Sequence, residues 1–518
     1  MIKEIISSLD LQSTALSLAV ITITTLIYYF IIYPLYFHPL AKVPGPKICA
    51  LTEYYILYKS WNQERNRYIN ALHEKYGSIV RIGPNAVDIS DITYQKDIYV
   101  GNYDKTGFYA QFVNYNEPNT FSTTTKKEHI QSRRTSHKFY SKSTICSTGV
   151  MNRVEKVTKD TLKVLELSSG ETINAFIVFC DMAMDAVTSF SFGSDNYDSL
   201  LADPFGKGKE VVEDFSVQSS PMFWVTEMPE WFEWVASTEV YTASEKCLTF
   251  IERQFDKSLK FIGETEAKDE PTLLRVYFES GLKEPIAKLK GFNVMRTKSE
   301  FFDHIAAGHV TTSTTLSYLF YELGKYPEMQ RKLQAEIDGI ENGGEIIDYA
   351  TLDDEEGLPY FHAVLNETFR VHAAIPGQEP RVVPEKGLLF QGNEICPMVK
   401  IPGGTTITMQ PWSLHRVRSV FPDPEKFDPQ RWIDASPEQL KVMRAHLMQF
   451  GAGTRMCIGM NLAMAEIKLA VGNIMARYNI ELDDKFNYEY DGEMLDIYTT
   501  VPRSERMDLK FIPRDVST

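Results

Sequence analysis

Several signals that mark common protein classes are missing from this chain. Its 518 residues include only six cysteines, and they are scattered without a Cys-x-x-Cys pair. This argues against a disulfide framework or a zinc site and favours reduced thiols in a cytosolic compartment. We find neither the Gly-x-Gly-x-x-Gly turn of a dinucleotide site nor a Walker-type phosphate loop. The chain is therefore expected to carry no nicotinamide or flavin site of its own.

Positive charge is also in short supply. Lysine and arginine total 54 against 69 aspartate and glutamate residues, a formal net charge of −15. A net acidic chain without a basic tract is not expected to bind nucleic acid. Hydrophobic residues make up 43% and charged residues 24% of the chain, which is an ordinary globular composition with enough material for a large core.

A long run without charged side chains, residues 11–37, lies near the N-terminus. It exceeds the roughly 20 residues that a membrane helix needs, and Pro34 is expected to end or kink that helix. The alternatives are a cleaved signal peptide, for which the run is too long and no clear cleavage site follows, and a core helix. The far end of the run carries tyrosines suited to an interfacial belt: Tyr28, Tyr29, Tyr33 and Tyr36.

These features predict four segments. They are a tail over residues 1–10, a transmembrane anchor over 11–37, a proline-rich hinge over 38–47 and one large domain over 48–518. The flank before the anchor has Lys3, offset by Glu4 and Asp10. The positive-inside rule therefore places the large domain in the cytosol, because the other flank carries five basic residues: Lys42, Lys47, Lys59, Arg65 and Arg67.

The stretch with the most chemical content is a glycine-rich turn that presents one cysteine ahead of a helix. It reads Phe450-Gly451-Ala452-Gly453-Thr454-Arg455-Met456-Cys457-Ile458-Gly459, and residues 461–470 after it are good helix formers. A cysteine at a helix start meets free N–H groups and the positive end of the helix dipole, which favour thiolate. A lone thiolate suits a haem iron that needs one axial sulfur. The alternative is a buried structural thiol.

The turn fits the pattern Phe-x-x-Gly-x-Arg-x-Cys-x-Gly, and on it the chain resembles the cytochrome P450 family. The resemblance implies a mainly α fold with a smaller β region, preceded here by one N-terminal transmembrane helix. It also implies haem b, with Cys457 as the axial ligand of the iron. Other residues that would contact this cofactor are Phe450, Gly459 and, at its propionates, Arg455, Arg381, His129 and Arg133.

For two of these residues, the spacing in the sequence alone also suggests a function. His129 and Arg133 are four positions apart and share one helical face, where two donors could hold carboxylates. The alternative is a solvated basic face. The loop before them, residues 101–125, is rich in aromatic side chains that either cover a core or line a pocket. The resemblance places a substrate-contacting loop there, a mobile lid over residues 205–234 and a further substrate contact at residues 497–500.

A long helix is expected from a capping box at Thr297-Lys298-Ser299-Glu300 to Lys325. Its middle, Ala306-Ala307-Gly308-His309-Val310-Thr311-Thr312, resembles the oxygen-side motif of the family. The small residues could also serve close helix packing. Thr311 would steer protons, but Val310 stands where an acid is usual. Water and Thr311 could suffice, His309 or His304 could substitute for the acid, or the chemistry needs fewer protons.

A second resemblance lies further along the chain. Glu367 and Arg370 form an i,i+3 pair, which alone is most often a surface salt bridge. With Pro429-Gln430-Arg431-Trp432 following, the family pattern implies a buried structural triad of Glu367, Arg370 and Arg431 beside the haem loop.

The resemblance implies a haem-thiolate monooxygenase of the endoplasmic reticulum membrane. It would insert one oxygen atom from O2 into a lipophilic small molecule, such as a terpenoid or polyketide intermediate of fungal secondary metabolism. Electrons would come from NADPH-cytochrome P450 reductase. Cys457 and Thr311 would be the catalytic residues. The alternatives are a haem-thiolate isomerase or peroxide-dependent oxidase, suggested by Val310, and a non-catalytic haem-binding protein.

Overall fold

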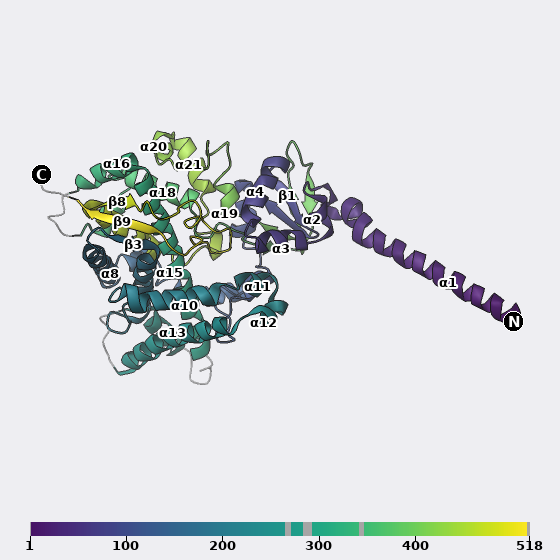
Figure 1. Cartoon of the computed structure of the whole chain (residues 1–518), viewed down its shortest axis with the longest axis horizontal. Coiled ribbons are helices and arrows are strands. Elements are labelled where there is room, and N and C mark those ends of the chain that lie inside the picture. The colour runs from purple at the N-terminus through teal and green to yellow at the C-terminus, as the bar shows by residue number, and fades with distance from the viewer. Residues whose placement is uncertain (1, 265–270, 283–292, 341–345, 515–518) are drawn as a thin grey trace.

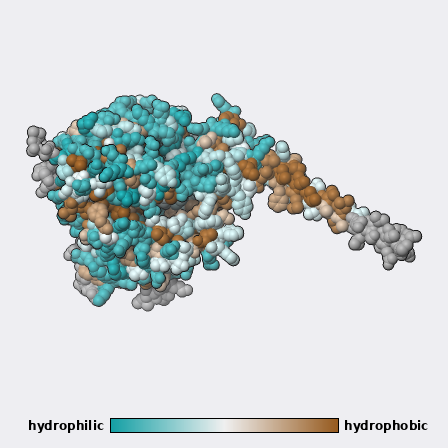
Figure 2. All heavy atoms as spheres, in the orientation of Figure 1, coloured by the Kyte–Doolittle hydropathy of each residue, from teal (hydrophilic) through white to brown (hydrophobic). Residues whose placement is uncertain are grey.

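The computed structural model describes residues 2–264, 271–282, 293–340 and 346–514. The chain begins as a rod, helix α1 (Ile2–Ile27), continues as the π-helix η1 (Tyr28–Phe37) and enters a large globular body (Figure 1). The rod is largely hydrophobic (Figure 2), and its part Ser13–Phe37 is long and apolar enough to cross a membrane, with a mean hydropathy of 2.2. Helix α1 starts at Ile2, so it includes residues of the stretch 1–10 that the sequence analysis treats as a tail. Pro34 lies inside η1, which ends at Phe37.

Helices dominate the globular body, as the sequence predicts. The α-helices after α1 are α2 (Lys47–Leu51), α3 (Tyr54–Trp61), α4 (Arg65–Tyr76), α5 (Gly107–Ala110), α6 (Lys126–Ser136), α7 (Lys142–Ile145), α8 (Thr148–Leu167), α9 (Ala175–Phe192), α10 (Lys209–Ser219), α11 (Met222–Glu227), α12 (Phe232–Val235), α13 (Thr238–Glu264), α14 (Leu273–Leu282), α15 (Val294–Lys325), α16 (Pro327–Asp338), α17 (Tyr349–Leu352), α18 (Pro359–Val371), α19 (Pro411–Leu414), α20 (Gln430–Asp434), α21 (Pro437–His446) and α22 (Met460–Arg477). Shorter 3-10 or π turns are η2 (Pro39–Lys42), η3 (Ile92–Tyr94), η4 (Lys96–Val100), η5 (Pro204–Gly208), η6 (Pro229–Trp231) and η8 (Gly453–Arg455).

The strands form small sheets beside the helices. A mixed sheet has the order β1-β2-β7-β4, a second has β3-β9-β8, and β5 pairs with β6. Their bounds are β1 (Ile79–Gly83), β2 (Ala86–Ile89), β3 (Thr172–Asn174), β4 (Arg381–Val382), β5 (Leu388–Phe390), β6 (Val399–Ile401), β7 (Thr406–Thr408), β8 (Tyr478–Leu482) and β9 (Asp508–Pro513).

The strand pairs test two sequence expectations. The sequence of residues 78–89 predicts a strand, a turn at Gly83-Pro84-Asn85 and a second strand. This prediction is confirmed, since β1 and β2 are antiparallel with Ile79 opposite Ile89. The sequence of residues 494–512 predicts strands around a turn, and this prediction is wrong for most of that stretch. Its first part makes one isolated bridge, Met494 to Pro502, and regular pairing starts only at β9.

The centre of the body is the packing of α15 on α9. Helix α9 is apolar enough to cross a membrane, but it is almost entirely buried. The sequence of residues 181–192 predicts a core helix, and this prediction is confirmed. The rings of Phe179 on α9 and Phe320 on α15 stack with centroids 5.3 Å apart. A Cβ atom on Gly308 would lie only 3.2 Å from a methyl group of Val187. The small residue in α15 therefore serves close helix packing.

The start of α15 differs from the expected capping box. Asn293 is the N-cap, and its side chain accepts a hydrogen bond from the Arg296 N–H at 3.1 Å. Thr297 lies inside the helix, where its hydroxyl donates to the Asn293 carbonyl at 2.9 Å. The capping residue can be an asparagine as readily as a threonine. The sequence pattern therefore placed the N-cap of α15 four residues too late, at Thr297 instead of Asn293. The end at Lys325, with Pro327 opening α16, is as expected.

Candidate active site

The cysteine loop closes tightly on itself before α22. The Cys457 N–H donates to the Phe450 carbonyl at 2.8 Å. Gly451 and Gly453 have φ values of +67° and +69°, in the left-handed region that side chains rarely adopt. A Cβ atom on Gly453 would lie 2.2 Å from the Tyr99 carbonyl oxygen. The absent side chain at this position lets the loop approach η4 closely.

The Cys457 side chain is exposed, although many protein atoms surround its thiol. Burial raises the pKa of this thiol, while hydrogen bonds from the backbone N–H groups of Gly459 and Met460 and the charge of Arg133 lower it. The donors expected at the helix start are present. In the protein alone burial outweighs them, so a bound cation would be needed to hold the thiolate.

One face of α15 is less buried than the rest of this helix. It consists of Asp303, Ala306, Ala307, Val310 and Thr311, which lie within a narrow arc at 3.6 residues per turn. Ala307 is exposed although it sits in the middle of the longest core helix. The same face includes Asp303, whose charge acts on the Cys457 thiol. We infer that α15 and the cysteine loop border one shared interior space.

The hydroxyl of Thr311 lies on this face. It donates to the Ala307 carbonyl one turn earlier, at 2.8 Å. Val310 also belongs to the face, so no carboxylate stands beside Thr311 on its N-terminal side.

Neither histidine of α15 replaces the missing acid. The ring of His309 packs on Phe215 with centroids 4.9 Å apart, and its Nδ1 lies 2.9 Å from the Ile305 carbonyl oxygen. His304 pairs its Nδ1 with the Tyr140 hydroxyl at 3.2 Å. Burial lowers the pKa of both imidazoles to about 4. Both are therefore neutral at physiological pH. His309 lies on another side of α15 from Thr311, and His304, although on the same side, is buried against Tyr140.

The residues expected at the propionates gather into a cationic cluster beside the loop. Arg133 donates to the Met456 carbonyl at 2.7 Å. Arg455 donates to the Asn102 side chain and to the carbonyls of residues 123 and 124. His129 is buried, and its Nδ1 has no hydrogen-bond partner among the described residues. Burial, followed by the charges of four cations of this cluster, lowers the pKa of His129 to about 3.

Arg381 belongs to the same cluster. Its guanidinium donates to the Tyr109 hydroxyl at 3.0 Å and lies 3.7 Å from the Glu379 carboxylate. Lys105, which the sequence reasoning did not single out, is buried nearby, and its ammonium donates to the Phe121 carbonyl at 2.6 Å. A lysine inside the aromatic stretch 101–125 was the available signal for it. The cluster has more positive than negative groups, so it is suited to an anionic ligand.

These observations fit the haem group that the sequence suggests. A thiol with backbone donors faces a helix whose small and hydroxyl residues leave space, and an excess of buried cations is ready for two carboxylates. An unpartnered histidine nitrogen lies in the same cluster. Fold and site together point to the class of haem enzymes.

The comparisons agree with this class. The cytochrome P450 family model matches residues 43–498, and the chain belongs to the cytochrome P450 family. It is 28% identical to cytochrome P450 monooxygenase TRI4 of Fusarium sporotrichioides over 92% of this chain and 91% of the relative. It is 30% identical to cytochrome P450 monooxygenase orf2 of Aspergillus niger, over 88% and 89%. N-acetyltryptophan 6-hydroxylase ivoC of Emericella nidulans is 27% identical over 92% and 93%.

Membership defines the broad activity. The protein is an oxidoreductase of the monooxygenase type with a haem iron cofactor, a redox partner and a small-molecule substrate. Its apolar N-terminal helix indicates membrane anchoring.

The three residues expected as a structural triad meet behind the cysteine loop. Glu367 and Arg370 are fully buried and joined by two hydrogen bonds of 2.8 Å. Arg431 donates to the same carboxylate at 3.0 Å, and Trp432, which the sequence reasoning did not assign, donates at 2.9 Å. Arg370 also donates to the backbone carbonyls of His415, Pro424 and Lys426. The network thus fixes the polypeptide between α18 and α20.

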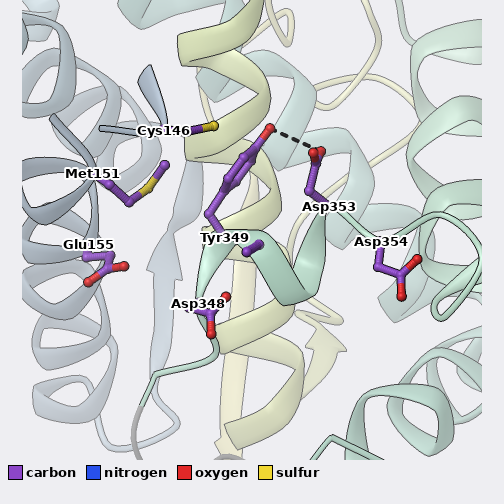
Figure 3. Close-up of a pocket in the computed structure, with 8 residues that line it drawn as sticks. Cys146, Met151, Glu155, Asp348, Tyr349, Asp353 and Asp354 are labelled. Carbon is purple, nitrogen blue, oxygen red and sulfur yellow. Dashed lines mark hydrogen bonds between the residues drawn. The ribbon is translucent and has the colours of Figure 1, made fainter. Parts of the chain in front are cut away.

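A separate hollow of about 540 Å³ lies between the start of α8 and α17 (Figure 3). The figure shows the Tyr349 hydroxyl bound to Asp353, at 3.0 Å, with the Cys146 sulfur nearby. Asp353 also pairs with Lys142 at 2.6 Å. Its lining contains no residue that the sequence placed at the active site, so we assign this hollow no part in it.

Proposed function

We propose that the protein is a membrane-anchored haem-thiolate monooxygenase that inserts one oxygen atom from O2 into a lipophilic small molecule of secondary metabolism. The single observation that carries this proposal is that the Cys457 thiol, with its N–H donors, feels the charge of Asp303, which lies on the same less buried face of α15 as Thr311. The other oxygen atom would leave as water. The fungal monooxygenases among the relatives support this metabolic setting.

In this proposal each residue of the site has a defined task. The Cys457 thiolate would be the axial ligand of haem b, which supplies the redox chemistry of O2 activation when bound. Arg133, Arg381 and Arg455 would hold the two propionates, because their positive charges are otherwise in excess. His129 is neutral and would add a hydrogen bond through its unpartnered Nδ1. Phe450, whose ring lies 5.6 Å from that of Phe369, would pack against the sulfur side of the cofactor, with Gly459 beside it.

Thr311 would hold the proton supply on the opposite side. Its hydroxyl donates a hydrogen bond to the Ala307 carbonyl. The lone pairs of the hydroxyl oxygen therefore stay available on the less buried face of α15. Val310 occupies the neighbouring position, and both histidines are neutral and paired elsewhere, with Tyr140 and the Ile305 carbonyl. Water bound at Thr311 is therefore the proton route that the residues support best.

Partner and location complete the proposal. Electrons would come from NADPH-cytochrome P450 reductase, since the chain has no nicotinamide or flavin motif. The anchor would hold the domain, residues 48–518, on the cytosolic side of the endoplasmic reticulum membrane. The expected lid region presents exposed aromatic side chains, with Trp231 51% and Trp234 85% exposed. They would suit the membrane interface.

Because Val310 stands where an acid is usual, a second candidate function is that of an isomerase or peroxide-dependent oxidase, which needs no delivered protons. The two differ in what drives turnover. The proposed monooxygenase requires both reductase and O2, whereas the second candidate works with peroxide, or with no oxidant, in the absence of reductase.

The first test is the carbon monoxide difference spectrum of the reduced full-length protein. We expect the strongly red-shifted Soret band of a thiolate-ligated haem in the wild type, and its loss in Cys457→Ala. Cys146→Ala is the matched control, because this thiol is also exposed but lines the separate hollow. A histidine-type band in the wild type, or an unchanged band in Cys457→Ala, would overturn the proposal.

A further inference from the structure

Residues 221–236, which we call the lid segment, lie between α10 and α13 and are held to the body by few contacts. They form α11, η6 and α12, which are short helices of six, three and four residues. The structure describes all of them, and Thr226 is the one side chain among them that is buried. A segment that buries so little of its surface opens at a lower cost in free energy than the helices of the core.

Aromatic rings join the lid segment to α3. Trp61, at the end of α3, meets Phe223 and Trp224 of α11 edge to face, with ring centroids 5.3 Å and 5.0 Å apart. Trp61 is still 52% exposed, so this contact lies at the surface of the molecule. Because water already reaches these rings, separating them exposes little additional apolar surface and costs little free energy.

One polar side chain of the lid segment is bonded to a distant loop. The side-chain amide of Gln378 donates to the Glu227 carboxylate at 2.6 Å. Within the described parts of the chain, no other hydrogen bond joins residues 221–236 to anything outside α10–α13. Burial raises the pKa of Glu227, while the charge of the buried Arg65 on α4 and the bond from Gln378 oppose this shift. Arg65 thus supports the ionised form of Glu227, which accepts the stronger hydrogen bond.

The loop that supplies Gln378 is fixed beside the cysteine loop. The N–H of its next residue, Glu379, donates to the Thr408 hydroxyl at 3.0 Å, and the Glu379 carbonyl accepts the Tyr99 hydroxyl at 2.9 Å. A Cβ atom on Gly451 of the cysteine loop would lie 3.4 Å from the Glu379 carboxylate. The bond between Glu227 and Gln378 therefore connects the lid segment to a well-fixed wall of the proposed active site.

We propose that the hydrogen bond between Glu227 and Gln378 is a latch that holds the lid segment closed, and that lipophilic ligands pass between α11 and the Gln378 loop when this bond breaks. A hydrogen bond to a charged group shifts an equilibrium between closed and open forms by on the order of 10- to 100-fold. The inference rests on the proposed function, because the space behind the latch is the one beside the cysteine loop. It adds a gate to that site and assigns Glu227 no contact with the reacting atoms.

The direct test is hydrogen exchange of the α11 amides in the full-length haem-loaded protein, followed by mass spectrometry. Glu227→Ala removes the acceptor of the latch, and Gln378→Ala removes its donor. We expect α11 to exchange on the order of 10- to 100-fold faster in each variant than in the wild type, with unchanged exchange in the core helix α9. Glu230→Ala is the matched control and should leave α11 unchanged, because Glu230 is an exposed glutamate of the same segment.

A variant with both changes separates a latch from two unrelated losses of stability. If Glu227 and Gln378 act through one bond, the double variant exchanges no faster in α11 than either single variant. Additive effects of the two changes contradict the proposal, as does exchange of α11 at the wild-type rate in Glu227→Ala.

Ligand entry is measured with 4-phenylimidazole, by stopped flow at the Soret band. A latch that closes equally over the empty and the occupied site slows entry and exit alike. The association and dissociation rate constants should therefore rise together in Glu227→Ala, with the dissociation constant unchanged. Unchanged rate constants contradict the latch, and a changed dissociation constant with an unchanged association rate would show that Glu227 instead contacts the ligand.

The carbon monoxide spectrum separates this proposal from the one on which it rests. A thiolate band in the wild type, together with wild-type exchange of α11 in both single variants, overturns the latch and leaves the monooxygenase intact. Absence of the thiolate band in the wild type overturns the monooxygenase, and with it the gate to its site, even if α11 exchanges faster in the variants.

Discussion

Glu367 has the most complete set of partners of any carboxylate near the active site. Its two oxygens accept hydrogen bonds from Arg370, Arg431, the Trp432 indole and the Asp428 N–H. Arg370 in turn has no surface exposure. A buried ion pair contributes little compared with an apolar pair, but removing one partner leaves the other charge uncompensated.

Glu367→Gln is therefore expected to destabilise the protein by about 3–5 kcal/mol. The matched control is Glu355→Gln, since the ion pair of Glu355 with Arg444 is 2.9 Å long and about half exposed on both sides. That variant should change stability by less than about 1 kcal/mol. Thermal unfolding of both variants beside the wild type measures the difference, and equal melting temperatures would show that the network is not needed for folding.

Thr311→Val tests whether the Thr311 hydroxyl supplies protons on the less buried face of α15. Valine matches threonine in shape and lacks only the hydroxyl. We expect the product formed per NADPH consumed to fall by at least about tenfold, given the 10²–10⁴ range of general acid–base catalysis. Thr315→Val is the control, because Thr315 makes the same bond one turn later, to the Thr311 carbonyl at 2.9 Å, but is buried. Unchanged coupling in Thr311→Val would rule out its role in proton supply.

His309 gives a prediction about pH. Its folded-state pKa is lowered to about 4 by burial, whereas in the unfolded chain it is about 6.5. The unfolded chain therefore takes up the proton first as the pH falls through this interval, and stability is lost there. In His309→Gln we expect the loss between pH 6.5 and pH 4 to be smaller by up to about 3 kcal/mol. The exposed His137, changed to Gln, is the control, and parallel pH profiles for all three proteins would contradict the expectation.

At the residue scale, the sequence was most informative where several residue types recur at fixed offsets. Cys457, Arg455 and Gly459 were found through one local pattern. Lys105 belongs to no local pattern, and its significance depends on the rings of Tyr109 and Phe121 that the fold brings around it. Glu367 and Arg370 are adjacent on a helix, but only the fold shows that they are buried.

The cysteine loop is the element whose conformation depends most on glycine. Gly453→Ala is expected to lose most of the thiolate haem band, because its Cβ atom would meet the Tyr99 carbonyl at 2.2 Å in addition to the cost of the left-handed backbone. Gly404→Ala is the matched control. Its φ of +81° is equally unfavourable, but no atom lies within 4 Å of the added Cβ.

Comparing Gly453→Ala with Gly404→Ala separates the cost of the left-handed backbone from the cost of the clash with the Tyr99 carbonyl. Gly404→Ala should keep its haem and lose only about 1 kcal/mol of stability. If Gly453→Ala also retains the full band at the same stability, the close approach to η4 is not a constraint on the site.

Helix existence was easier to predict than helix boundaries at the element scale. The apolar run of α9 and the end of α15 at Lys325 could be predicted because hydrophobic pattern and proline define them locally. The start of α15 could not, since Asn293 and Thr297 are both acceptable caps. The stretch before β9 carries strand-like residues, but the chain there pairs with loops such as Ala374, whose carbonyl accepts the Thr500 N–H at 2.9 Å.

At the scale of the whole molecule, the rod and the globular body are joined by hydrogen bonds. Arg81 is a buried residue of β1, and its guanidinium donates to the Pro34 carbonyl of η1 at 2.8 Å and to the Pro84 carbonyl at 2.6 Å. Burial lowers the pKa of Arg81 to about 10. The end of the anchor segment thus completes the surroundings of a buried cation, which composition and hydropathy do not reveal.

Two truncations test this junction. Removal of residues 1–27 deletes α1 and keeps Pro34, so we expect a protein that leaves the membrane fraction but melts like the full chain. Removal of residues 1–37 also takes away one acceptor of Arg81, and should cost about 1–3 kcal/mol more. The measurements are flotation with phospholipid vesicles and thermal unfolding followed at the haem band.

Equal melting temperatures for the two truncations would mean that water replaces the Pro34 carbonyl without loss, and that the anchor is only tethered to the body. A lower melting temperature for the longer deletion alone would show that the end of the anchor belongs to the folded unit.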